Sequence, residues 1–146
     1  MFVPRGTIAG DAPGATFGFV VSSGVIVTVG NVVTLVSGYV ENIADTGEPV
    51  LGVAAGTVTG NGTNKVQVYT DPNLIFYNDS DGTLAQTDVG KVYRTTASKK
   101  IDQSTGAVNT AYAFVLVGVD PDGDADASKG LFKIYRSQLA SNQLDA

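Results

Sequence analysis

The sequence has no cysteine, no histidine and no tryptophan. Without cysteine the chain has no disulfides and no thiolate zinc sites, and without histidine it has no imidazole metal ligands. Ser-His-Asp triads and Cys-His pairs are excluded for the same reason. The chain must therefore gain its stability from packing, or from burying surface in an oligomer.

Charge is scarce as well, at 16% of residues with a net charge of −5. No basic residue lies between Arg5 and Lys65, and Lys99-Lys100 is the only adjacent basic pair. A nucleic-acid partner needs a basic patch that neutralises phosphates, so we expect no binding to nucleic acid.

Long apolar runs are also missing. Gly, Ser, Thr and Asn interrupt every apolar stretch before the ~20 residues that a membrane-spanning helix needs, so no membrane insertion is expected. The N-terminal segment MFVPRGTIAGDAPG lacks the apolar centre of a signal peptide, because Pro4, Arg5 and Asp11 come too early. We expect the chain to be made in the cytoplasm.

The sequence does have valine, glycine and short apolar runs. Its 146 residues are 43% hydrophobic, which is enough for one packed domain, and its 18 glycines are typical of short strands joined by tight turns. These features predict an all-β fold, a single small β-barrel or sandwich of short antiparallel strands with little helix. We expect residues 1–15, interrupted by proline and glycine, to form an extended N-terminal arm, and residues 16–146 to form the single β domain.

The densest strand signal lies at residues 45–82. Apolar residues from Val50 to Val58 are followed by Asn61-Gly62, a pair that suits a tight hairpin turn, and then by strict alternation at residues 65–69. The turn at residues 71–73 leads into another apolar run. This pattern predicts a β-meander at the centre of the core.

The flanking strands follow the same rules of alternation and turn composition. We expect strands at residues 17–21, 25–29, 32–36, 91–94, 113–119 and 131–136. In the second of them Val25, Val27 and Val29 share one face. The continuous run 113–119 predicts a central strand buried on both faces. The polar segment 95–109 predicts a long surface loop, and residues 137–146 a helical turn or a frayed end.

Several patterns that resemble binding sites have simpler interpretations. The acidic residues 120–126 invite a calcium hypothesis, but an EF-hand loop begun at Asp120 would place Ala125 and Leu131 where Gly and Glu are needed. A solvated turn is the favoured interpretation. Only two glutamates occur, Glu41 and Glu48, and turn chemistry explains the aspartates, so no catalytic residues and no cofactor are predicted.

The glycines of residues 52–62 lack the lysine of a phosphate loop and favour bends and close strand approaches. The tripeptides at Asn61 and Asn78 match the glycosylation sequon by accident, since no secretion signal is expected. The six tyrosines are scattered, which favours cross-strand packing over a sugar-binding platform. These are Tyr39, Tyr69, Tyr77, Tyr93, Tyr112 and Tyr135.

The order of short motifs carries one resemblance. VLGV at residues 50–53, VQVYTDPNLIF at 66–76, DGTL at 81–84, DVG at 88–90 and VLVGV at 115–119 resemble a family of small tailed-bacteriophage head proteins, the capsid decoration or cement proteins. The resemblance covers about residues 25–135. It implies a non-enzymatic β-rich virion protein that sits on the outer capsid surface, bridges subunits of the major capsid protein and assembles as a homotrimer.

Within that resemblance we expect the N-terminal arm, which is shorter and less basic than the family pattern, to pair with a sheet edge of the capsid. The predicted contact residues are Phe2, Val3, Pro4, Arg5 and Ile8, and their deletion is expected to leave a folded domain that no longer binds heads. Two alternatives are another virion component of the tail, neck or fibre, and a carbohydrate-binding β module that uses exposed tyrosines.

Overall fold

The computed structural model describes residues 1–7, 16–43, 49–96, 99–107, 113–135 and 137–139. Within these ranges the chain is nearly all β, and the one helical element is a single 3₁₀ turn, η1 (Gln86–Asp88). Every pair of neighbouring strands is antiparallel. The sheets are not closed into a barrel but form a sandwich-like arrangement, which confirms the predicted fold class.

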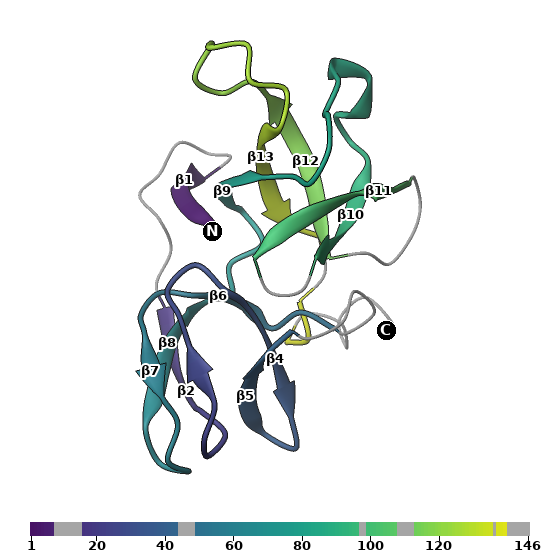
Figure 1. The fold of residues 1–146 in the computed structure, drawn as a ribbon. Helices are drawn as coiled ribbons and strands as arrows, with labels where there is room; N and C mark the ends of the chain where they lie inside the picture. Colours follow the sequence, from purple (N-terminus) through teal and green to yellow (C-terminus); the bar gives the residue numbers. More distant parts are fainter. Residues whose placement is uncertain (8–15, 44–48, 97–98, 108–112, 136, 140–146) are drawn as a thin grey trace.

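Two large sheets and one small pair make up the fold (Figure 1). The six-stranded sheet has the order β1 (Val3–Thr7), β9 (Leu74–Asp79), β13 (Lys129–Ile134), β12 (Phe114–Val119), β10 (Val92–Thr96), β11 (Lys100–Ala107). The five-stranded sheet has the order β2 (Thr16–Val20), β8 (Lys65–Tyr69), β6 (Gly52–Ala54), β4 (Val32–Val36), β5 (Tyr39–Asn42). The short strands β3 (Ile26–Val27) and β7 (Val58–Thr59) pair with each other.

The five-stranded sheet is buried on both faces at its centre. Val32 and Val53, which are register partners in β4 and β6, contribute to a core shared with Phe76, Phe114 and other residues of the six-stranded sheet. The residues that follow them point the other way and pack in a second core with Val27 of β3. This double burial explains why β4 is an almost unbroken apolar run, since polar residues on either face would lose hydration.

The predicted meander at residues 45–82 is wrong. β8 and β9 are consecutive in the chain but belong to different sheets, and the turn at residues 71–73 carries the chain from one sheet to the other. β7 and β8, on either side of Asn61-Gly62, do not pair with each other. The Asn61 side chain accepts hydrogen bonds from the backbone amides of Thr63 and Asn64, so it organises a loop between sheets instead of a hairpin.

Two further strand predictions need correction. The strand expected at residues 25–29 reduces to β3, because a turn closed by the Asn31 amide on the Thr28 carbonyl ends it, and Val29 is 41% exposed instead of sharing a buried face. β12 is central in its sheet, but its burial alternates from Phe114 onward, so it is buried mainly on one face and not on both.

The expected surface loop at residues 95–109 is also wrong, because most of it forms β11. This strand pairs with β10 and buries Ile101 completely. Its other residues are mostly polar because the strand lies at the edge of the sheet. At the C-terminal side, residues 137–139 form a turn in which the Gln138 side-chain amide accepts from the Leu35 amide and donates to the Leu35 carbonyl, at a part of β4 that β6 does not pair with.

Among the described residues no helix is long and apolar enough to cross a bilayer.

Candidate interaction surfaces

The N-terminal residues contact the protein's own core. Phe2 is 2% exposed; its ring stacks on Phe114 with centroids 4.4 Å apart and meets Phe76 edge-on at 5.8 Å. The Phe2 amide also donates to the Gly30 carbonyl, 3.1 Å away. Phe2 is therefore not available to a capsid in this structure, and its burial argues against the expectation that the segment can be deleted from a folded domain.

β1 follows directly and forms an edge strand of the six-stranded sheet. Val3 pairs with Tyr77 and Pro4 with Phe76 of β9, and the register shifts by one residue between Pro4 and Gly6. A proline, a bulge and the charge of Arg5 are the features with which natural edge strands resist further pairing. This geometry disfavours the predicted pairing of residues 3–5 with a capsid sheet edge. The remaining predicted contact, Ile8, lies outside the described residues.

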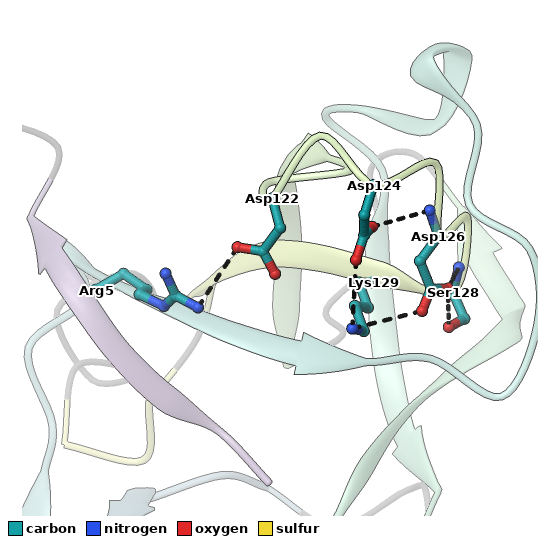
Figure 2. A network of polar contacts seen from close by, with 6 residues as sticks. All are labelled: Arg5, Asp122, Asp124, Asp126, Ser128 and Lys129. Carbon is teal, nitrogen blue, oxygen red and sulfur yellow. Dashed lines mark hydrogen bonds and ion pairs between the residues drawn. The ribbon is translucent and has the colours of Figure 1, made fainter.

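Arg5 connects β1 to the loop between β12 and β13 (Figure 2). Its guanidinium lies 4.7 Å from the centroid of the Tyr77 ring, and its Nη2 is 3.9 Å from Oδ1 of Asp122. At the start of β13, Lys129 Nζ lies 3.5 Å from Asp126 and 3.8 Å from Asp124 of the same loop. These pairs are exposed, so each one contributes little stability by itself.

The pKa shifts in this network favour the ionised forms of Asp126 and Lys129. Hydrogen bonds from the Ser128 hydroxyl and amide lower the pKa of Asp126. The Tyr77 hydroxyl, followed by the negative charges of Asp124 and Asp126, raises the pKa of Lys129. Both groups stay ionised around neutral pH, which suits a structural network and not proton transfer.

Residues 120–126 form the turn between two strands that the sequence predicts. Asp120 begins it at a positive φ of 46°, and one of its carboxylate oxygens, Oδ1, is buried without a hydrogen-bond partner. Within the described part of the chain, no three carboxylate, histidine or cysteine side chains come together as metal ligands would. The loop therefore carries no metal assignment.

The glycines predicted to mark close approaches do so at two positions. A Cβ on Gly52 would collide with the Tyr69 carbonyl, and one on Gly60 with the Ser22 carbonyl. Because neither glycine has a side chain, the backbone at Gly52 can approach that of Tyr69, and the backbone at Gly60 can approach that of Ser22.

The five described tyrosines do not share one exposed platform. The two most exposed of them, Tyr39 at 43% and Tyr135 at 45%, lie in β5 and directly after β13, next to different sheets. Tyr93 is buried, with only 1% of its surface exposed. Desolvation by this burial, followed by the negative charge of Asp88, raises its pKa to about 12. Tyr112 lies outside the described residues.

The most extended surface feature is an uneven distribution of charge. Across residues 16–43 and 49–70, which build the five-stranded sheet and the β3–β7 pair, the only charged residues are Glu41 and Lys65. We call this part the charge-poor half; every other described charge lies in or beside the six-stranded sheet. Five exposed apolar side chains also belong to this half: Phe17, Ile26, Val29, Val36 and Tyr39.

Two of these apolar residues, Val36 and Tyr39, are direct register partners at the tip of the β4–β5 hairpin. The absence of basic residues between Arg5 and Lys65 is visible in the sequence, but it indicates a surface only once the fold gathers residues 16–43 and 49–70 on one side of the molecule (Figure 1).

No protein-family model matches this chain, and no curated protein or solved structure matches it either.

Proposed function

We propose that this chain is a structural, non-catalytic virion protein that binds the outer surface of a tailed-phage head and stabilises the shell. The motif order at residues 50–119 supports the family, and the charge-poor half supports a docking role. Centres of protein interfaces are depleted of charged residues and often contain aromatic ones; this half is poor in charge and exposes Phe17 and Tyr39. The charged six-stranded side would then face solvent.

The charge-poor half is the observation that carries the proposal. Because exposed Val36 and Tyr39 stand side by side on a hairpin tip, they offer a compact apolar contact. A protein that binds the assembled shell and not its separated subunits stabilises the shell by mass action. In this proposal the N-terminal strand holds the domain together, and the hairpin tip replaces residues 2–8 as the main shell contact.

The test mixes purified protein with undecorated, expanded phage heads and measures bound copies by co-sedimentation and cryo-microscopy. Tyr39→Ser should weaken head binding about tenfold, since truncating an aromatic interface anchor typically costs more than 1 kcal/mol. Tyr135→Ser, at an equally exposed tyrosine on the other sheet, is the matched control and should bind normally. An equal loss of head binding in both variants, or head binding unaffected by Tyr39→Ser, would show that the hairpin tip is not the shell contact.

The same material separates the alternatives. Association with isolated tails and not with heads would favour a tail, neck or fibre component. Binding to a glycan array that Tyr39→Ser abolishes would favour a carbohydrate-binding module. A complete lack of binding to heads, with a folded protein, contradicts the proposal.

A further inference from the structure

Asn61 is the only asparagine in the sequence that precedes a glycine, and it is exposed. An asparagine at such a position is open to deamidation, because the glycine has no Cβ to hinder attack by its amide nitrogen. Hydroxide removes the proton from the Gly62 amide, and the nitrogen bonds to the side-chain carbonyl carbon of Asn61. The side-chain NH₂ group takes a proton from water and leaves as ammonia, which closes a succinimide ring. Water then opens the ring at either carbonyl and gives aspartate or isoaspartate.

The fold holds the Asn61 side chain in a different arrangement from the one that this reaction needs. Its Oδ1 accepts three hydrogen bonds, from the Thr63 amide at 2.9 Å, the Thr63 hydroxyl at 2.9 Å and the Asn64 amide at 2.7 Å. All of these donors lie beyond Gly62 in the chain. A succinimide would fix the same carbonyl in the plane of the Gly62 nitrogen, so the side chain must give up this set of hydrogen bonds before the ring closes.

The main chain on both sides of Asn61 is held as well. Before it, the Gly60 amide donates to the Val25 carbonyl at 2.7 Å. After it, the Asn64 carbonyl accepts from the Val21 amide at 2.9 Å. Ring closure must rotate the peptide groups between these two anchors, and the anchors resist that rotation.

We infer that Asn61 is a latent modification site, which the folded loop protects and which deamidates when the loop opens. A tenfold difference in rate corresponds to about 1.4 kcal/mol, roughly the net contribution of one or two ordinary hydrogen bonds. Since three hydrogen bonds hold Oδ1, deamidation of Asn61 should be at least about tenfold slower in the folded protein than in the unfolded chain. This inference is independent of head binding.

The products of the reaction differ from asparagine in ways that bear on this surface. Both carry a carboxylate, which adds a negative charge to the charge-poor half, where Glu41 and Lys65 are the only charged residues. Isoaspartate also lengthens the main chain by one carbon atom between the two anchors. Protection by the loop therefore preserves both the charge pattern and the backbone of this half.

The first test compares the native protein with the same protein unfolded in guanidinium chloride, at one mildly alkaline pH and one temperature. Mass spectrometry of the peptide that contains Asn61 measures the deamidated fraction over time, and enzymatic methylation identifies isoaspartate. Asn61 should react at least about tenfold faster in the unfolded chain. Equal rates in the two states would overturn the inference.

The second test removes one of the three hydrogen bonds. Thr63→Val lacks the hydroxyl donor but keeps the size of the side chain, so it should speed deamidation of the folded protein about two- to tenfold. It should leave the rate in the unfolded chain unchanged. Thr63→Ser keeps a hydroxyl, is the matched control and should react at the parent rate. Circular dichroism checks that both variants are folded, and a folded Thr63→Val protein that reacts as slowly as the parent would overturn the assigned cause.

Discussion

Single residues in this protein have roles that depend on what surrounds them. Tyr93 and Tyr39 have the same side chain, but the first is buried against Phe132 and the second lies on a hairpin tip. Gly60 and Gly56 lie four residues apart, but only the first is crowded by a neighbouring backbone. Each contrast gives a matched pair of variants.

Tyr93 should make the protein sensitive to alkali. Its pKa in the folded state is about 12, whereas an unfolded tyrosine ionises near 10, so the folded state holds the proton more tightly. The stability from the neutral phenol is fully present below about pH 10 and is lost as pH rises toward 12. Urea unfolding at a series of pH values should show this decline, and Tyr93→Phe should flatten it. An unchanged slope in that variant would contradict the assignment.

Gly60→Ala should lower the free energy of unfolding by about 1–3 kcal/mol, because the new methyl group must displace the Ser22 carbonyl or the Val21 side chain. Gly56→Ala, where nothing lies within 4 Å of the added carbon, should change stability by less than about 0.5 kcal/mol. Denaturant unfolding of the two variants checks the difference. Similar values for both would mean that the β7–β8 loop relaxes freely.

At the scale of elements, the N-terminal strand β1 differs most from the sequence-based expectation, because it joins the six-stranded sheet. β1 is separated from β2 by residues 8–15, and the two strands belong to different sheets. Phe2, immediately before β1, fills a space between two aromatic residues that come from β9 and β12. Because this segment completes the core, its removal should destabilise the folded domain whether or not a partner is present.

Phe2→Ala should therefore lower the free energy of unfolding by about 3–5 kcal/mol, the usual cost of emptying a buried phenylalanine site. Tyr135→Ala, at a side chain that is 45% exposed, is the control and should stay within about 0.5 kcal/mol of the parent protein. Denaturant titration followed by tyrosine fluorescence measures both. A small effect of Phe2→Ala would restore the arm as a separate, removable segment.

At the scale of the whole molecule, most charges of the described residues lie in or beside the six-stranded sheet, whereas the exposed apolar side chains of the β4–β5 tip lie in the charge-poor half. If the charge-poor half docks on a phage shell, few ion pairs form across the contact. Screening by salt acts on charged groups and leaves apolar contacts in place.

Binding to undecorated heads should accordingly change little between low salt and 1 M NaCl. Co-sedimentation at several salt concentrations measures it, and the parent heads without added protein serve as the control for shell stability. A steep loss of binding with salt would indicate that the six-stranded side, with Arg5 and the acidic loop, makes the contact.

The sequence alone determines the fold class and the orientation of some strands. In β8 and β13 the alternation of apolar and polar residues matches the observed burial, because successive side chains of a strand point to opposite faces. The turn at residues 120–126 is predictable from its proline, glycine and aspartates, and the glycines at 52 and 60 are predictable as points of close approach because they have no side chain. The lack of cysteine and histidine excludes disulfides, thiolate and imidazole metal ligands, and Ser-His-Asp triads whatever the fold.

Tertiary structure decides which strand pairs with which, and therefore where the surfaces lie. A short apolar run does not specify its partner, so consecutive strands were expected to pair where β8 and β9 in fact separate. β11 has no hydrophobic pattern because pairing to β10 at an edge requires none, and Phe2 is a core residue only because β9 and β12 meet beside it. The charge-poor half arises from these long-range pairings, which no local pattern encodes.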